Sequence, residues 1–265
     1  MNEHRLINFL LRSFVVMVFL FIFLPIAGSF VFSFNIDRFP SLPLGGFSLH
    51  WYEMIASDPA VWQAFRNSLT VGVVVSLVST LLGFTAAYTD FRYQFFGKSI
   101  YMALALLPPT IPVVIMGLAM LAFLSRVGLS GEIYAVMISH IVMCAPFAMA
   151  VIRMRLAQMD PNIEAAAWNL GANQWKAMRY VILPFTAPSI FAALFVTMAV
   201  SFDEFAVAWF VSGLNETVPV RILNTLQGQV SPTINAIGTI VFITTMTLVI
   251  LAQLLLMRRR KPASA

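Results

Sequence analysis

The polar segment MDPNIEAAAWNLGANQWKAMRYVILP, residues 159–184, interrupts a chain that is otherwise apolar enough for lipid. Asp160 followed by Pro161 favours a helix start, because Asp caps the first turn and Pro suits the first helical position. Gly171 fits the residue just past a helix end, where a left-handed backbone is needed. Asn173 can cap the next helix. The segment therefore predicts two short helices around a glycine turn.

Each of these two expected helices carries an apolar stripe at helical spacing. Pro184 is expected to interrupt the chain before the next apolar stretch begins. The residues alone allow two interpretations: an amphipathic connector that rests on the membrane, or a rigid knob that inserts into a groove of a partner protein. The first stripe comprises Ile163, Ala166, Ala167 and Leu170, and the second comprises Trp175, Met178 and Ile182.

The composition of the chain indicates an integral membrane protein. Of its 265 residues, 60% are hydrophobic and only 10% are charged, whereas an average globular domain carries about 25% charged residues. Six apolar stretches reach the length of about 20 residues that a membrane-spanning helix needs. We therefore predict an all-α protein with six transmembrane helices in a single domain, residues 1–265, with spans at about 13–34, 67–89, 100–124, 133–152, 187–210 and 234–257.

The orientation follows from the distribution of Lys and Arg. An even number of spans puts both termini on one side, and that side then holds twelve of the 16 basic residues. Because Lys and Arg are retained on the cytoplasmic side, the N- and C-termini and the polar segment 159–184 are predicted to be cytoplasmic. The first apolar run exceeds the ~7–15-residue core of a signal peptide, so it is expected to be a retained helix.

Several function classes are disfavoured by the sequence. The net charge of +5 is explained by topology, so no nucleic-acid partner is expected. A lone Cys144 excludes an internal disulfide and a cysteine metal cluster. His4, His50 and His140 are scattered, so no metal site is predicted, and His140 is expected to pack or hydrogen-bond within a helix bundle. RYQFFGKS, residues 92–99, lacks the first glycine of a phosphate-binding loop.

Three prolines interrupt the third apolar stretch. LLPPTIP, residues 106–112, places Pro108, Pro109 and Pro112 within it. Each proline removes a backbone donor and kinks a helix unless its neighbours compensate. Because such a kink is costly in lipid, this segment is expected to lie inside the bundle.

Asp203 and Glu204 are the acidic residues placed within a predicted span. A charge at mid-bilayer costs about 2.5–3.5 kcal/mol on insertion scales, so an intramembrane acid suggests function. Neighbouring helix positions differ by about 100°, so the two carboxylates cannot point the same way: one could bind substrate and the other a helix partner.

The functional interpretation of this acidic pair is a cation site that faces a translocation path. Carboxylates attract ammonium groups, and Phe202, Phe205 and Trp209 offer faces for cation–π contacts. The alternative is that both acids lie at the membrane interface, where they are solvated or paired with Arg221 or with a second subunit.

The polar segment is similar to the cytoplasmic signature of the permease subunits of bacterial ABC importers, in which Glu-Ala-Ala is followed by Gly and then by Ile-x-Leu-Pro. Here it reads EAAAWNLG at residues 164–171 and VILP at residues 181–184. Two positions depart from the family pattern. Ala165 stands six places before the glycine, where the family has Glu, with Glu164 one place earlier, and Val181 replaces the usual Ile.

The resemblance extends over most of the chain. WQAFRNSL, residues 62–69, and SFDEFAVAWFVSG, residues 201–213, look like the polyamine-type branch of that family, in particular its spermidine/putrescine permease C subunits. The resemblance implies a type I importer fold in the bacterial inner membrane. It also implies a second permease subunit in a heterodimer, a dimer of ATPase subunits and a periplasmic substrate-binding protein.

The resemblance further implies that residues 160–171 form a coupling helix, which sits in a cleft of the ATPase and passes on its closure. The implied ATPase-coupling residues are Glu164, Ala165, Ala166, Gly171 and Ala172. ATP and Mg²⁺ would bind to the partner ATPase, with no cofactor on this chain, which would not itself be an enzyme.

The hypothesis from the sequence is a permease subunit of an ATP-driven importer for a small organic cation, with putrescine or spermidine as the first candidates. Its substrate path would include Asp203, Glu204, Phe205 and Trp209. Within the same machine, the cargo could instead be an opine, another amine-containing solute or ferric ion. A different class is an ion-coupled secondary transporter, although such transporters usually show internal repeats, and no clear repeat is present. A third is a structural membrane subunit without transport activity.

Overall fold

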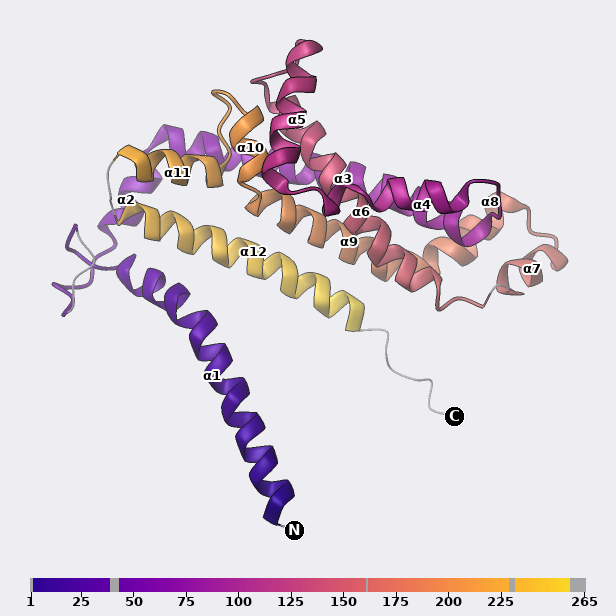
Figure 1. Ribbon diagram of the computed structural model, residues 1–265, viewed down its shortest axis with the longest axis horizontal. Helices are drawn as coiled ribbons and strands as arrows, with labels where there is room; N and C mark the ends of the chain where they lie inside the picture. The colour runs from indigo at the N-terminus through magenta and orange to yellow at the C-terminus, as the bar shows by residue number, and fades with distance from the viewer. Residues whose placement is uncertain (1, 39–42, 161, 229–231, 258–265) are drawn as a thin grey trace. The chain divides into compact units, whose positions relative to one another are not determined.

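The computed structural model describes residues 2–38, 43–160, 162–228 and 232–257. These residues are almost wholly helical, which confirms the all-α prediction; the other regular feature among them is a single antiparallel bridge between Asn35 and Phe47. In chain order (Figure 1) the elements are α1 (Asn2–Phe32), α2 (His50–Ser57), α3 (Pro59–Arg92), α4 (Lys98–Leu106), η1 (Pro108–Thr110), α5 (Val113–Arg126), α6 (Ile133–Leu156), α7 (Asn162–Asn169), α8 (Gln174–Ala177), η2 (Met178–Ile182), α9 (Leu183–Asp203), α10 (Ala206–Val211), α11 (Val218–Gly228) and α12 (Thr233–Met257).

Five helices of the described chain are long and apolar enough to cross a membrane: Leu6–Phe32, Pro59–Arg92, Ile133–Leu156, Gln174–Asp203 and Thr233–Leu254. The remaining expected span, 100–124, is not one helix. It is divided into α4, the 3-10 turn η1 and the shorter apolar helix α5. The expected span 187–210 is likewise divided, because α9 ends at Asp203 and α10 begins at Ala206.

The prolines of the third stretch do not make it a buried segment of this chain. Neither α4 nor η1 contains a buried residue, so the expectation that it lies inside the bundle was wrong for the single subunit. The backbone around these prolines forms its hydrogen bonds within the segment itself. The carbonyl of Leu107 accepts from the backbone N–H and from the hydroxyl of Thr110, at 2.9 and 2.7 Å. A tight turn therefore replaces the hydrogen bonds that the prolines remove.

The chain forms two compact units, 1–62 with 222–242 and 63–221 with 243–265. In the first unit, the hydroxyl of Ser29 on α1 donates to Asn235 Oδ1 on α12 at 3.1 Å. The indole of the buried Trp51 donates to the carbonyl of Asn35 at 2.6 Å. Most of α1 is nevertheless exposed, since its apolar window buries none of its residues.

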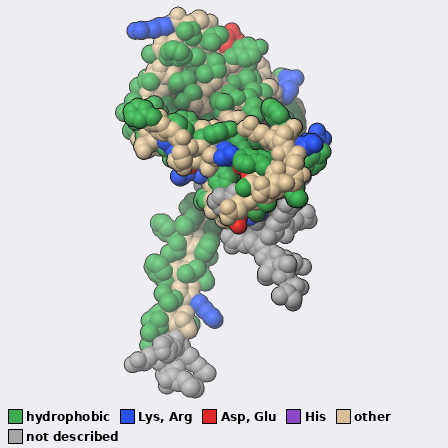
Figure 2. Space-filling view, turned by 90° about the vertical axis from the view of Figure 1, so that its right-hand side faces the viewer, with side chains coloured by type: hydrophobic (Ala, Val, Ile, Leu, Met, Phe, Trp, Pro, Cys, Tyr) green, Lys and Arg blue, Asp and Glu red, His purple; other side chains and the backbone are tan. Residues whose placement is uncertain are grey.

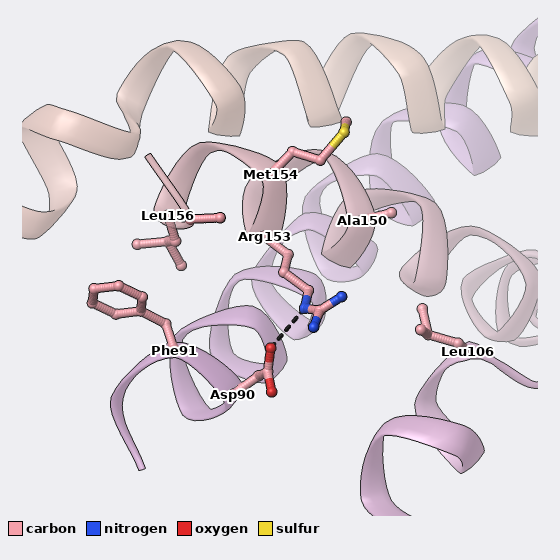
Figure 3. A pocket seen from close by; sticks show the side chains of 8 residues that line it. Asp90, Phe91, Leu106, Ala150, Arg153, Met154 and Leu156 are labelled. Atoms are coloured by element: carbon pink, nitrogen blue, oxygen red, sulfur yellow. Dashed lines mark hydrogen bonds and ion pairs between the residues drawn. The ribbon is translucent and has the colours of Figure 1, made fainter. Parts of the chain in front are cut away.

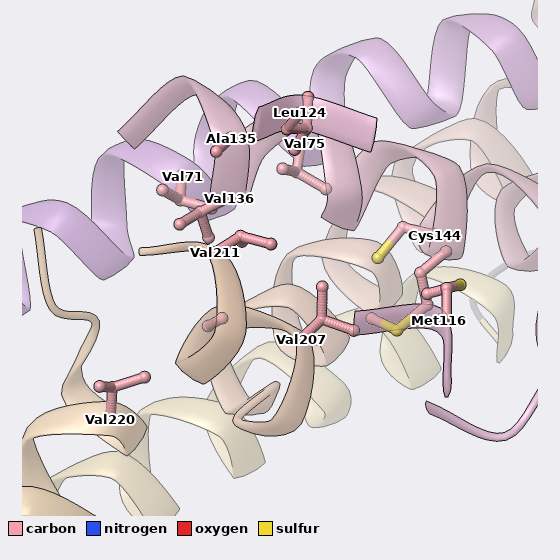
Figure 4. Close-up of a cluster of buried hydrophobic side chains, with 12 residues drawn as sticks. Val71, Val75, Met116, Leu124, Ala135, Val136, Cys144, Val207, Val211 and Val220 are labelled. Atoms are coloured by element: carbon pink, nitrogen blue, oxygen red, sulfur yellow. The ribbon is translucent and has the colours of Figure 1, made fainter. Parts of the chain in front are cut away.

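The second unit has its core around α6, which lies alongside α9, while α10 lies against α5. One buried cluster joins α3, α5, α6 and α10 (Figure 4). Glycines allow the close approaches between these helices. A Cβ on Gly83 of α3 would lie 2.6 Å from the backbone nitrogen of Met149 on α6. The buried members of the cluster include Val71, Val75, Met116, Leu124, Val136, Val207 and Val211.

The chain does not break at Pro184, contrary to the sequence-based expectation. Helix α8 continues through η2, a π-helical stretch, into α9, and Pro184 stands in the first turn of α9. Proline cannot donate to the preceding turn and its ring clashes there in an ordinary α-helix. The wider π turn just before it accommodates the ring, as π-bulges do elsewhere.

Candidate functional site

The hairpin formed by α7 and α8 has the local structure that its sequence predicts. Asp160 Oδ1 accepts from the backbone N–H of Asn162 at 2.9 Å and so caps α7. Gly171 has φ +83°, in the left-handed region. Asn173 caps α8, because its side chain accepts from the N–H of Lys176 at 2.9 Å.

The glycine turn closes α7 by two backbone hydrogen bonds. The N–H of Gly171 donates to the carbonyl of Trp168 at 2.8 Å, and the N–H of Ala172 donates to that of Ala167 at 3.0 Å. This is the pattern of a Schellman motif, which requires a left-handed residue at the position of Gly171. The angle between α7 and α8 is therefore set by the turn itself.

The apolar stripe of α7 faces outward. Leu170 is 89% exposed, Ile163 and Ala166 are exposed and Ala167 is half-buried; Ala165, beside the stripe, is exposed as well. Figure 2 looks onto the end of the molecule that carries α7 and α8 and shows hydrophobic side chains there, with Lys and Arg among them. An exposed apolar surface rimmed by charge is typical of a protein–protein contact.

The inward side of α7 carries Glu164, which is 4% exposed. Its Oε2 lies 3.1 Å from Arg92 Nε, and its Oε1 accepts from the hydroxyl of Tyr88 at 3.3 Å. The Arg92 guanidinium in turn lies over the ring of Trp168, 4.7 Å from its centroid. Sequence reasoning missed Tyr88 and Arg92, since 72 or more residues separate them from Glu164. The one available signal in the sequence was Arg92 itself, a basic residue at the end of an apolar helix that could pair with an acid.

A second polar cluster lies at the same end of α3. Asp90 Oδ2 is 2.6 Å from Arg153 Nε on α6, and Asp90 Oδ1 is 3.3 Å from Lys98 Nζ on α4. These contacts join three helices. Asp90 and Arg153 also line an open cavity of about 380 Å³ (Figure 3), whose other lining residues include Phe91, Leu106, Met154 and Leu156.

The acidic pair lies at a helix break rather than within one span. Asp203 is the last residue of α9, and Glu204 has an extended backbone with φ −72° and ψ 122°. The Glu204 carboxylate accepts from the backbone N–H groups of Val207 and Ala208, at 3.0 and 3.2 Å. It therefore caps the first turn of α10, where a negative charge is favourable.

Glu204 also faces a buried histidine. Its Oε2 lies 3.4 Å from His140 Nε2 on α6, and His140 Nδ1 is hydrogen-bonded to the hydroxyl of Ser201 at 2.9 Å. His140 is completely buried, which confirms its expected role as a hydrogen-bonding residue of the bundle. Glu204 is thus the acid of the pair that has a helix partner.

Asp203 differs from Glu204 in its surroundings. It is exposed, and it makes no hydrogen bond or ion pair to any other described residue. Arg221, a partner that the sequence allowed for, lies instead 3.5 Å from Glu216. Just beyond the break, the ring of Phe205 lies 6.3 Å from that of Trp209, which is 45% exposed.

The comparisons with known proteins agree on the family. Residues 79–262 match the family model described as "Binding-protein-dependent transport system inner membrane component". The chain is 31% identical over 248 residues to the spermidine/putrescine transport system permease protein PotC of Haemophilus influenzae, covering 93% of this chain and 96% of that protein. It is 29% identical to the putrescine transport system permease protein PotI of Escherichia coli K12, covering 84% and 82%.

Solved structures show the same fold. A bacterial ABC transporter involved in the import of the acidic polysaccharide alginate has a chain with TM-score 0.74 and 17% identity, covering 98% of each chain. A further structure of an alginate ABC transporter, with TM-score 0.74 and 16% identity over 98% of this chain and 96% of that one, contains an alginate pentasaccharide-bound periplasmic protein. An amino acid ABC transporter reaches TM-score 0.60 at 20% identity, covering 78% of this chain and 98% of that one.

The family match spans more than half of the chain, and the PotC relative is covered almost entirely. The chain therefore belongs to the family of binding-protein-dependent transport system inner membrane components: it is a multi-pass permease subunit of an ABC importer.

Proposed function

We propose that this permease subunit forms part of the translocation path for a small organic cation, with a polyamine such as putrescine or spermidine as its cargo. The observation that carries the proposal is Asp203, an exposed carboxylate at the break between α9 and α10. The 31% identity to a protein named as a spermidine/putrescine permease supports the choice of cargo.

The chemistry at the break suits an organic cation. An ammonium group would find the carboxylate of Asp203 unpaired among the described residues and the aromatic faces of Phe205 and Trp209 nearby in the chain. A cation over an aromatic face gains about 0.5–2 kcal/mol, more as water is excluded. Glu204 has a different role in this proposal: its carboxylate caps the N-terminus of α10 and so stabilises the break between α9 and α10.

The proposed route of energy input is the α7 hairpin. Its outward apolar stripe would dock into a cleft of an ATPase subunit, with Ala165, Ala166, Gly171 and Ala172 at or beside the contact and Glu164 on the inner side. ATP-driven closure of the ATPase dimer would then favour the outward-open arrangement, because the ATPase binds the two permease states with different affinity.

The proposed assembly contains three further kinds of component. It has a second permease subunit, two ATPase subunits that bind ATP and Mg²⁺, and a periplasmic substrate-binding protein. The periplasmic protein in the alginate transporter structure and the PotC and PotI relatives support this assembly. The chain would bind no cofactor and perform no chemistry, and its segment 159–184 would face the cytoplasm with both termini.

The test is uptake of labelled putrescine and spermidine by cells that carry the complete operon. Wild type is compared with Asp203→Asn, with Glu204→Gln and with Glu132→Gln, a matched control on an exposed acid at the start of α6. Loss of uptake in Asp203→Asn, with normal membrane expression and an unaffected control, would support the cation site. Unchanged uptake in Asp203→Asn would remove this residue from the path.

The cargo is tested in the same experiment. If wild-type cells take up neither polyamine, the polyamine proposal fails while the importer remains. An opine, another amine-containing solute and ferric ion are then the labelled substrates to use.

A further inference from the structure

The residue that α7 buries carries a carboxylate, although the same helix also has apolar side chains. Glu164 lies inside while Ile163 and Leu170 lie outside. Burying a charge is unfavourable unless it is paired and hydrogen-bonded. Both oxygens of Glu164 are engaged, one by Arg92 and one by Tyr88. A buried ion pair is weak evidence for added stability, and in some proteins it serves to fix one geometry.

Both partners of Glu164 belong to the last two turns of α3, a helix that is far from α7 along the chain. Arg92 is itself held in place, since its guanidinium lies over the rings of Trp168 and Tyr93, at 4.7 and 5.8 Å from their centroids. Trp168 is on α7, so Arg92 contacts this helix at two positions one turn apart.

The other limb of the hairpin reaches the same end of α3. Gln174 at the start of α8 donates from Nε2 to the hydroxyl of Tyr93 at 3.1 Å. Tyr93 directly follows α3. The hairpin therefore contacts the end of α3 through α7 and through α8.

We infer that Tyr88, Arg92 and Glu164 form a latch that makes α7 and the end of α3 move as one body, so that a displacement of α7 is passed directly to α3. The inference rests on the proposed role of α7 as the coupling helix. Glu164 is then a positioning residue of this helix and not a contact of the ATPase. The next residue, Ala165, lies about 100° further round the helix. It is exposed, whereas Glu164 is buried.

The first experiment measures whether the two helices move together, and it needs no cargo. The assembled transporter is placed in lipid nanodiscs with nitroxide labels at Thr85→Cys on α3 and Asn169→Cys on α7, both exposed. The background is Cys144→Ala, which removes the single, buried cysteine of the chain. Distances are recorded by pulsed electron paramagnetic resonance without nucleotide and after trapping with Mg-ATP and vanadate.

The latch predicts a narrow distance distribution that is the same in both states. Glu164→Gln and Arg92→Gln should each broaden or shift it, and the exchanged pair, Arg92→Glu with Glu164→Arg, should restore it. The inference would be overturned if the distance between the two labels changed between the nucleotide-free and the vanadate-trapped state while Glu164 and Arg92 are unaltered. It would also be overturned if Glu164→Gln and Arg92→Gln kept the original distance distribution.

The second experiment separates positioning from docking. Spermidine uptake per ATP hydrolysed should fall about 2- to 30-fold in Glu164→Gln and Arg92→Gln, the range expected for residues that carry coupling between sites. Co-purification of the ATPase subunit should be unchanged. Lys176→Gln, an exposed cation on α8, is the matched control. If a single variant loses the ATPase subunit, Glu164 serves docking and the latch is refuted.

The failures of the two proposals are distinguishable. Wild-type transporter that does not take up spermidine contradicts the proposed cargo alone, and the spin-label distances still decide on the latch. An ATPase subunit that stays bound when the outward face of α7 is made charged contradicts the proposed coupling role of α7 instead.

Discussion

Glu204 Oε2 lies 3.4 Å from Nε2 of the fully buried His140, while the same carboxylate caps the first turn of α10. The break in the chain after α9 is thus held by one side chain that contacts two helices. This arrangement separates two neighbouring acids by function: Glu204 maintains the backbone, and Asp203 remains exposed beside it.

Replacement of Glu204 by alanine should destabilise the second unit. The change removes the carboxylate that caps α10 and faces the buried His140 Nε2, which should cost about 0.5–2 kcal/mol, as for other lost helix caps. Glu204→Gln should cost less, because its amide oxygen can still accept from Val207. Thermal unfolding of the purified permease complex in detergent measures the difference, and equal losses for the two variants would contradict it.

Gly83→Ala should weaken the packing of α3 on α6. The added Cβ would lie 2.6 Å from the backbone nitrogen of Met149, so the two helices must separate, at a cost of about 1–3 kcal/mol for overpacking. Gly72→Ala on the same helix is the control, since its Cβ would meet Met198 at an ordinary 3.5 Å. Thermal stability should fall for Gly83→Ala only.

Gly171→Val should uncouple ATP hydrolysis from transport. Nothing lies within 4 Å of a Cβ at this position, but φ is +83°, and a left-handed conformation costs about 1–2 kcal/mol for residues other than glycine. The effect is therefore on the angle of the hairpin and not on packing. Gly171→Asn should keep most of the activity, because asparagine tolerates this region. Uptake and ATPase rates are measured in parallel, and normal uptake in Gly171→Val would refute the role of the turn.

Leu170→Asp should abolish docking of the ATPase subunit without lowering the stability of the permease. Leu170 is 89% exposed, so it contributes little to the fold, and a charge there would be buried unpaired in the proposed contact. Leu170→Met is the conservative control. Co-purification of the ATPase subunit measures docking, and its full retention in Leu170→Asp would place the contact elsewhere.

The local features of the site were predictable because they depend on residues close in the chain. Asp160, Gly171 and Asn173 have the caps and the left-handed turn that their residue types favour. The partners of Glu164 and Glu204 were not predictable, because Arg92 and His140 come from other helices and no periodic pattern relates them.

Two proline positions show a further limit of prediction from the sequence. At Pro108 and Pro109 the predicted kink became a full break with its own 3-10 turn, and the segment stayed exposed. At Pro184 the predicted break became a continuous helix, because a π turn absorbed the ring. Proline signals that the backbone must change, but the neighbouring turns decide whether the helix ends.

The π stretch Met178–Ile182 also determines how the hairpin is rotated about the helix axis relative to α9. A π turn holds an extra residue relative to an α-turn, and one residue corresponds to about 100° of rotation about the helix axis. The wider turn absorbs this rotation, so deleting one residue from the stretch would restore an ordinary α-helix and leave α7 and α8 close to their present orientation around α9. Converting the stretch to α-helical hydrogen bonds with all its residues kept would instead rotate α7 and α8 about the axis of α9 by about that angle. The outward stripe of α7 would then point to a different side of the molecule, with every side chain of the hairpin intact.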